Sequence, residues 1–216
     1  MIPKKIHTFW LSNSTPDNWV LKNIETWRRI NPDYEIIIHH ADEFIDLLRY
    51  PYYNQMLNNR SWAYATDYLR SKVLFEVGGW YFDADVTCHK SLNGLEREFG
   101  NRDRWIGYEG IYPFKTVECA SMGFSPQDEI MRVLVEHYEN WIDGDEIKIM
   151  PQLLNELCEQ NNIDINPVLS HEYLSGVSGD FIPIPKNHPD SAQAYKTSHV
   201  STYRSYTVHQ FSHTGY

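Results

Sequence analysis

Apolar residues that repeat with two different periods divide the first part of the chain into predicted strands and helices. Residues 6–11 and 34–39 are short runs rich in β-branched and aromatic side chains, and each predicts a strand. Between them, apolar residues recur at helical spacing after Asp17, which is placed to cap that helix. A further helix is predicted over residues 42–48.

A longer helical repeat, over residues 61–77, leads into an unusual stretch of sequence. Gly78 and Gly79 follow the repeat, as glycines that end helices do. Residues 80–82 then predict a third strand. The resulting order, β-α-β-α-α-β, is typical of a layered α/β sheet of the doubly wound type.

The second part of the chain is less regular. Two more helices are predicted over residues 130–141 and 152–160. Beyond residue 180 the chain is polar and contains several prolines, before a β-rich tail over residues 202–211. Because no repeat or low-complexity linker interrupts this pattern, we expect a single domain spanning residues 1–216.

Composition narrows the classes of protein that fit. The 29 acidic and 19 basic residues of this 216-residue chain give a net charge of -10, which argues against nucleic acid as a partner. No apolar run is long enough for a signal peptide or a transmembrane helix. The three cysteines form no Cys-x-x-Cys motif. We therefore expect a cytoplasmic protein with reduced thiols and no transmembrane segment.

Two aspartates, Asp83 and Asp85, directly follow the third predicted strand. Ligands of α/β sheets bind beyond the carboxyl ends of the strands, and residues two apart on an extended chain point the same way. The pair can therefore present two carboxylates to a hard divalent cation such as Mg²⁺ or Mn²⁺. The alternative is a strand end whose acids are solvated.

Asp67 and Arg70 lie three residues apart on the preceding helix and share one of its faces. Taken alone, this spacing favours a surface ion pair that contributes little stability. The alternative is that both side chains point into a binding cleft. There Asp67 would accept hydrogen bonds from sugar hydroxyls, and Arg70 would hold a phosphate or sugar oxygen.

Five short motifs, taken in order, carry a resemblance to a known family. They are Ile2–His7, Phe9-Trp10, Asn31–Glu35, Thr66-Asp67 with Arg70, and Gly78–Val86. Together they resemble glycosyltransferase family 32, which contains bacterial capsule-synthesis transferases and fungal initiating mannosyltransferases. That family is related to the glucosylating domain of large clostridial toxins. The tail segment Tyr206–Phe211 also resembles the closing motif of the family.

The resemblance implies an α/β chain with a single-domain nucleotide-sugar transferase A-type fold, in which helices flank a Rossmann-like mixed sheet. Residues 1–90 would form the nucleotide-sugar binding half, and residues 91–216 the acceptor side and a C-terminal lid. The resemblance also implies a divalent metal cofactor, Mn²⁺ or Mg²⁺, and retention of the anomeric configuration.

The same resemblance assigns roles to individual residues. Asp85 would ligate the metal directly, and Asp83 would face the ribose and sugar and meet the metal through water. Asp67 and Arg70 would bind the donor sugar, and Asp83, Asp85 and Arg70 are the expected catalytic residues. Trp10 resembles the toxin-type tryptophan that stacks on uracil, a contact worth about 1–3 kcal/mol. The alternative for Trp10 is a core position on the first strand.

In the tail, His209 would be a late metal ligand that folds over the diphosphate, with His213 as the alternative ligand. A purely structural histidine is the other interpretation. The chain departs from the family here, because Thr214-Gly215-Tyr216 stands where Gly-Ser-Trp or Ser-Trp is usual. Glu109 and Tyr112 are candidates for the acceptor side, although a loop or core position would also explain them.

These expectations combine into a metal-dependent retaining transferase. It would move a hexose from a nucleotide-sugar donor, UDP-galactose or UDP-glucose, to a glycan or lipid-linked glycan in capsular or other surface polysaccharide synthesis. A lipid-linked acceptor would bring the protein peripherally to the inner face of the cell membrane. Two other functions stay open: hydrolysis of a nucleotide sugar by the same acids, and non-catalytic binding of glycans.

Overall fold

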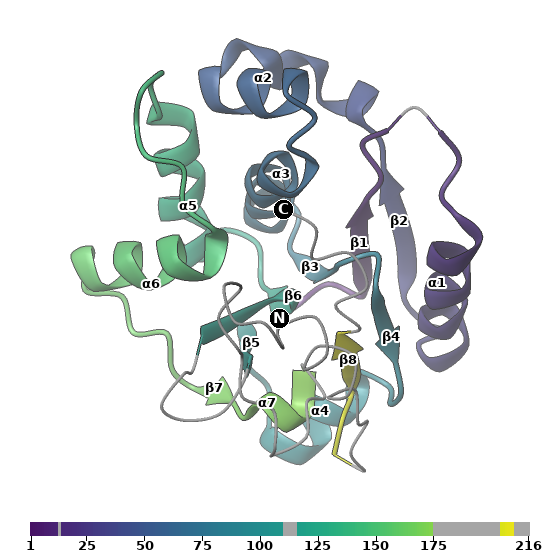
Figure 1. Ribbon diagram of the computed structural model, residues 1–216. Coiled ribbons are helices and arrows are strands. Elements are labelled where there is room, and N and C mark those ends of the chain that lie inside the picture. Colours follow the sequence, from purple (N-terminus) through teal and green to yellow (C-terminus); the bar gives the residue numbers. More distant parts are fainter. Residues whose placement is uncertain (13, 110–115, 175–203, 210–216) are drawn as a thin grey trace, which may run out of the picture.

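The computed structural model describes residues 1–216 except 13, 110–115, 175–203 and 210–216. Its centre is a six-stranded sheet with the order β2-β1-β3-β6-β5-β7 (Figure 1). The strands are β1 (Lys5–Phe9), β2 (Glu35–His39), β3 (Gly79–Phe82), β5 (Arg104–Glu109), β6 (Thr116–Phe124) and β7 (Val168–Leu169). β1 is parallel to β2 and β3, whereas β6 is antiparallel to β3 and β5, so the sheet is mixed.

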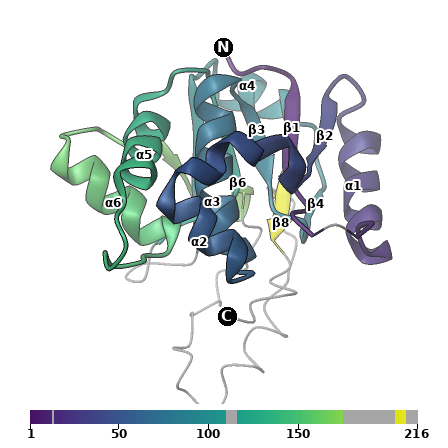
Figure 2. The same cartoon turned by 90° about the horizontal axis from the view of Figure 1, so that it is seen from above.

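Helices cover both faces of this sheet. They are α1 (Asn18–Ile30), the 3-10 helix η1 (Ala41–Arg49), α2 (Pro51–Asn58), α3 (Trp62–Glu76), α4 (Asn93–Phe99), α5 (Glu129–Asn140), α6 (Met150–Gln160) and α7 (His171–Leu174). Figure 2 shows α2 and α3 lying over the strands. None of the helices in the described ranges is long and apolar enough to cross a membrane.

The residues of β3 alternate between two hydrophobic cores. Trp80 and Phe82 pack in the cluster that contains Trp27 of α1, while Tyr81 packs in the cluster formed with α2, α3, α5 and α6. This alternation follows from the period of two along a strand. Cores on both faces confirm the predicted α/β layering.

The two glycines before β3 are required by their backbone conformations. Gly78 and Gly79 have φ angles of 68° and 110°, in the region that side chains rarely adopt. A Cβ on Gly79 would also lie 2.9 Å from the carbonyl oxygen of Lys5. The chain therefore leaves α3 sharply and enters the sheet beside β1.

A second, two-stranded sheet joins the middle of the chain to its tail. β4 (Val86–Cys88) pairs antiparallel with β8 (Thr207–His209), with Val86 opposite His209 (Figure 1). Tyr206 fastens this tail, because its backbone nitrogen donates to the carbonyl of Tyr173 at 2.8 Å and its hydroxyl donates to Glu98 at 2.8 Å. The tail is thus placed next to the residues that follow β3.

Several predicted elements are confirmed, and others were missed. The strands near residues 6–11, 34–39 and 80–82 correspond to β1, β2 and β3, and the helices after Asp17 and over 61–77 correspond to α1 and α3. Asp17 occupies the N-cap position, but its side chain makes no capping hydrogen bond. The segment 42–48 lies in a 3-10 helix, and α2, α4, β4 and β6 were not predicted.

All three cysteines lie in the interior of the protein. Cys88, Cys119 and Cys158 are all buried, and none of them forms a disulfide. The division into a donor-binding half and an acceptor half remains a prediction.

Candidate metal and donor site

Asp83 and Asp85 lie in a tight turn between β3 and β4. The backbone nitrogen of Val86 donates to the carbonyl oxygen of Asp83 at 3.0 Å and closes this turn. The expectation that the two acids lie on an extended segment was therefore wrong, because the chain turns there before β4 begins. The turn nevertheless brings both carboxylates to the same place.

Helix α1 and strand β6 hold the turn in position. The side-chain amide of Asn23 donates to the carbonyl oxygen of Ala84 at 2.8 Å, and the indole nitrogen of Trp27 donates to that of Val86 at 2.8 Å. On the other side, the backbone nitrogen of Asp83 donates to the carbonyl oxygen of Ala120 at 2.8 Å. The loop that presents the acids is thus tied to two rigid elements.

His209 joins the two aspartates from the far end of the chain. Its Nε2 lies 3.3 Å from Asp85 Oδ1, and one ligand atom each from Asp83, Asp85 and His209 lie within 4.8 Å of one another. Neighbouring ligands of an octahedral Mg²⁺ ion are about 3 Å apart, as its bond lengths near 2.1 Å require. Two carboxylate oxygens and an imidazole nitrogen at these separations can therefore hold a divalent cation.

A buried carboxylate that the sequence did not indicate lies behind His209. Glu118 of β6 is 1% exposed, and its Oε1 lies 3.6 Å from His209 Nδ1. Burial by itself would lower the pKa of His209, but the charges of Glu118 and Asp85 outweigh it and raise the pKa. Glu118 could have been noticed as an acid within the apolar run of β6, had that strand been predicted.

Asp67 and Arg70 form an ion pair inside the protein. Each is 6% exposed, and the guanidinium Nη2 of Arg70 donates to Asp67 Oδ1. Its Nη1 donates to the carbonyl oxygen of Cys119 at 2.7 Å and lies 3.8 Å from Asp83 Oδ1. The surface ion pair favoured by spacing alone was therefore wrong. This face of α3 is buried. The Asp67–Arg70 pair therefore lies next to the turn that contains Asp83 and Asp85.

Tyr81 completes this buried cluster. Its hydroxyl donates to Asp83 Oδ1, and the guanidinium carbon of Arg70 lies 4.5 Å from the centre of its ring. Burial raises the pKa of Asp67 to about 6, and the charge of Arg70 limits the shift. Burial also raises the pKa of Asp83. One guanidinium thus faces two carboxylates in an environment that strengthens electrostatic interactions.

The remaining candidates are less connected to this cluster. Trp10 is half-buried just after β1, packs against the core that contains Trp27, and donates from its indole nitrogen to Ser14 Oγ at 3.4 Å. Glu109 is the last residue of β5. Tyr112 and His213 lie outside the described residues.

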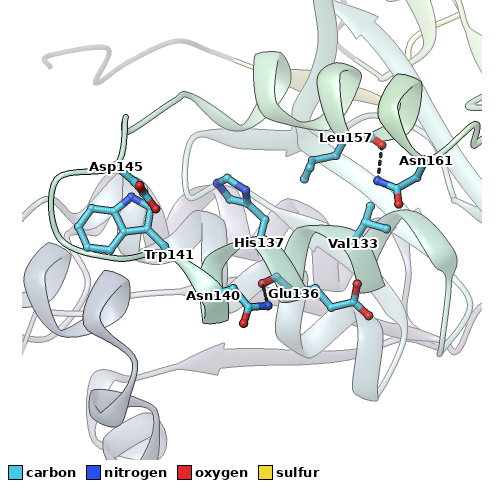
Figure 3. Close-up of a pocket in the computed structure, with 8 residues that line it drawn as sticks. All are labelled: Val133, Glu136, His137, Asn140, Trp141, Asp145, Leu157 and Asn161. Atoms are coloured by element: carbon cyan, nitrogen blue, oxygen red, sulfur yellow. Dashed lines mark hydrogen bonds between the residues drawn. The ribbon is translucent and has the colours of Figure 1, made fainter.

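A separate cavity of about 280 Å³ lies between α5 and α6 (Figure 3). It is lined by Val133, Glu136, His137, Asn140, Trp141, Asp145, Leu157 and Asn161. None of these residues was predicted to be functional, and none belongs to the cluster around Asp83.

Comparisons with known proteins agree with this geometry. Residues 16–106 match the family described as "Glycosyltransferase sugar-binding region containing DXD motif". Over 97 residues the chain is 30% identical to "Inositol phosphoceramide mannosyltransferase 3" of Schizosaccharomyces pombe, a match that covers 44% of this chain and 27% of that protein. The chain thus spans about a quarter of the length of that relative.

Two solved structures share the fold. The "PaToxG Glycosyltransferase" superposes with a TM-score of 0.56 at 21% identity, covering 74% of this chain and 70% of that one. A "glycosyltransferase involved in the glycosylation of the major capsid of PBCV-1" gives a TM-score of 0.52 at 11% identity, covering 97% and 94%. These likenesses confirm the predicted A-type fold. The family match covers residues 16–106 and includes the turn of Asp83 and Asp85.

Proposed function

We propose that this protein is a metal-dependent, retaining glycosyltransferase that moves a hexose from a nucleoside diphosphate to a hydroxyl group. The observation that carries the proposal is the convergence of Asp83, Asp85 and His209 within 4.8 Å of one another, beside the buried guanidinium of Arg70. In this proposal the three side chains bind the cation, and Asp67, Arg70 and Asp83 bind the donor.

The buried ion pair suits the handling of a charged donor. Asp67 and the carbonyl of Cys119 both accept hydrogen bonds from Arg70, so the guanidinium is held without needing to reorganise when a ligand arrives. From this position Arg70 binds an oxygen of the sugar or of the diphosphate. When bound to the three ligands, a divalent cation neutralises the charge that develops on the diphosphate as the glycosidic bond breaks.

Retention of configuration follows in this proposal from attack on the same face. The acceptor hydroxyl hydrogen-bonds to the departing phosphate oxygen, passes its proton to that oxygen and bonds to the anomeric carbon. Such a reaction depends on positioning more than on a protein nucleophile. Glu109 and Tyr112 remain the candidates for the acceptor side.

The donor and acceptor are proposed by class. We propose UDP-galactose or UDP-glucose, because the family resemblance implies that Trp10 stacks on uracil. The matched relative is named a mannosyltransferase, which adds a mannose donor. The name of that relative also includes a ceramide lipid. This supports an acceptor that contains a lipid. With such an acceptor we also propose a place at the inner face of the membrane and a role in surface polysaccharide synthesis.

A thermal-shift screen of the full chain with UDP, GDP and CDP, each with and without Mn²⁺, tests the proposal. We expect one nucleotide to raise Tm only when Mn²⁺ is present, and Asp85→Asn to lose this effect. Assays of the matching donor with and without sugar acceptors then separate transfer from hydrolysis. Release of free sugar at the same rate with every acceptor would favour the hydrolase. Glycan binding without any need for nucleotide would favour a binding module.

A further inference from the structure

The buried carboxylate of Glu118 has no role in the metal binding or donor binding proposed above. It is 1% exposed, and its Oε1 accepts a hydrogen bond of 2.7 Å from the backbone nitrogen of Ala120. Its Oε2 is buried without a hydrogen-bond partner within the described part of the chain. Burying an ionised carboxylate is costly unless it is paired. Its position therefore calls for an explanation.

The ring of His209 lies close to this carboxylate and can carry the opposite charge. The Nδ1 of His209 lies 3.6 Å from Glu118 Oε1, while the Nε2 on the opposite side of the ring lies 3.3 Å from Asp85 Oδ1. An ionised carboxylate only accepts hydrogen bonds, so a hydrogen on Nδ1 suits the side of the ring that faces Glu118. Nε2 faces the carboxylate of Asp85, and with a cation bound by Asp83 and Asp85 it would offer its lone pair to that ion while Nδ1 keeps its hydrogen.

The backbone of β6 couples this arrangement to the turn of acids. The nitrogen of Ala120 fixes the Glu118 carboxylate, and the carbonyl oxygen of the same residue accepts from the backbone nitrogen of Asp83. One short segment of strand therefore supports both the histidine and the aspartates. Ligand histidines in proteins commonly donate their second ring hydrogen to a carboxylate, which fixes the ring orientation and raises the basicity of the ligating nitrogen.

We propose that Glu118 is a positioning residue, which holds His209 in the tautomer and orientation that direct Nε2 at the cation bound by Asp83 and Asp85. This inference rests on the metal site of the proposed function. It adds a residue that never touches the donor and acts only through His209.

The affinity of the full chain for Mn²⁺ alone, measured by the loss of the free-ion signal in electron paramagnetic resonance, tests this role without any assay of activity. Glu118→Leu keeps the volume of the side chain and removes its charge. We expect Mn²⁺ to bind this variant about 10–100-fold more weakly, the usual effect of removing such a partner. Glu118→Gln retains an acceptor oxygen, so we expect an affinity between those of Glu118→Leu and the unmodified protein.

Asp128→Asn is the matched control. Asp128 is also a buried carboxylate, but it caps α5 and pairs with Arg104 at 3.0 Å. We expect Asp128→Asn to lower Tm while leaving the affinity for Mn²⁺ unchanged. If Glu118→Leu fails to fold, as judged by circular dichroism, then Glu118→Gln decides: weaker binding supports the role, and unchanged binding overturns it.

Asp85→Asn separates failure of this inference from failure of the proposed function. If Asp85→Asn abolishes Mn²⁺ binding while Glu118→Leu binds within about twofold of the unmodified protein, below the usual effect of such partners, the positioning role is wrong and the metal site stands. If Asp85→Asn binds Mn²⁺ as well as the unmodified protein, the metal site itself is wrong, and the role of Glu118 falls with it.

Discussion

The side-chain amide of Asn23 donates a hydrogen bond of 2.8 Å to the carbonyl oxygen of Ala84, the residue between the two aspartates of the site. Asn23 lies on α1, 61 residues before Ala84 in the sequence. Its side chain is buried, with 7% of the residue exposed. The bond therefore fixes the middle of the turn from outside the sheet. Through it, a buried residue of α1 supports the backbone between the two carboxylates.

Asn23→Ala is expected to weaken Mn²⁺ binding several-fold. Loss of the amide leaves the part-buried carbonyl of Ala84 without its donor, which costs up to about 1–3 kcal/mol, and it frees the turn to move. Isothermal titration with Mn²⁺ and urea unfolding measure the two effects. Asn140→Ala is the control, because this exposed residue donates a bond of the same 2.8 Å length to the carbonyl of Glu136 on α5. Equal affinities for Asn23→Ala and the control would show that the turn needs no support from α1.

Removing Arg70 alone should destabilise the protein strongly. Arg70→Met leaves Asp67 buried without its cation, and breaking a buried ion pair in this way typically costs about 3–5 kcal/mol. In a double-mutant cycle measured by urea unfolding, Asp67→Asn with Arg70→Met should therefore cost less than the sum of the two single changes. All three variants should lack transferase activity.

The exposed pair of Arg132 and Glu136 provides the comparison for this cycle. Their side chains are 46% and 55% exposed, and exposed pairs contribute less than about 1 kcal/mol. Arg132→Met should therefore change the free energy of unfolding little. A similar loss for Arg70→Met would mean that the Asp67–Arg70 pair is better solvated than its burial indicates.

Trp10→Ala should weaken the binding of the preferred nucleotide by about 1–3 kcal/mol, the usual contribution of stacking a base on an aromatic side chain. Trp10→Phe keeps a flat aromatic face and should retain most of the affinity. Calorimetric titration with the nucleotide and Mn²⁺ measures both variants, and Tm shows whether the core is affected. A lower Tm with unaltered affinity would assign Trp10 to the core that contains Trp27.

Local patterns predicted the first half of the fold well, because β1, β2 and β3 are marked by short apolar runs and α1 and α3 by helical repeats. The position of Asp83 and Asp85 after β3 was predictable for the same reason. α2 was missed because its buried side chains include Tyr52 and Tyr53, which are not distinctive of a helix at this short length.

The candidate site was predicted less completely than the fold. Spacing three apart cannot tell which side of α3 faces the core, and on this helix Asp67, Tyr68, Leu69, Arg70 and Ser71 are all buried. Glu118 was missed because its role depends on contact with His209, which lies far away in the sequence. Contacts of this kind follow from the pairing of β4 with β8, and no local pattern indicates that pairing.

His7 makes the stability of the protein depend on pH. It is 1% exposed, its Nε2 lies 3.1 Å from the carbonyl oxygen of Gly78, and its Nδ1 lies 3.0 Å from His39 Nε2. A carbonyl only accepts, so Nε2 carries the hydrogen and Nδ1 is left as the acceptor. Burial, with a further contribution from His39, lowers the pKa of His7 to about 4.

A lowered pKa means that the unfolded chain takes up a proton before the folded protein does as the pH falls. The contribution of neutral His7 is therefore complete above the ordinary pKa of 6.5 and is lost between that value and about 4. A shift of this size corresponds to a loss on the order of 3 kcal/mol across that interval. His7→Gln keeps a donor for Gly78 but cannot titrate. The difference in free energy of unfolding between the unmodified protein and this variant should therefore narrow as the pH falls.

Urea unfolding of both proteins at a series of pH values measures this difference, and it cancels the titration of groups that the two share. His40→Gln is the control for replacing a histidine, because His40 is exposed and directly follows β2. A gap for His7→Gln that does not change with pH would mean that the pKa of His7 is the same in the folded and the unfolded protein. Its hydrogen bonds with Gly78 and His39 would then need a different assignment.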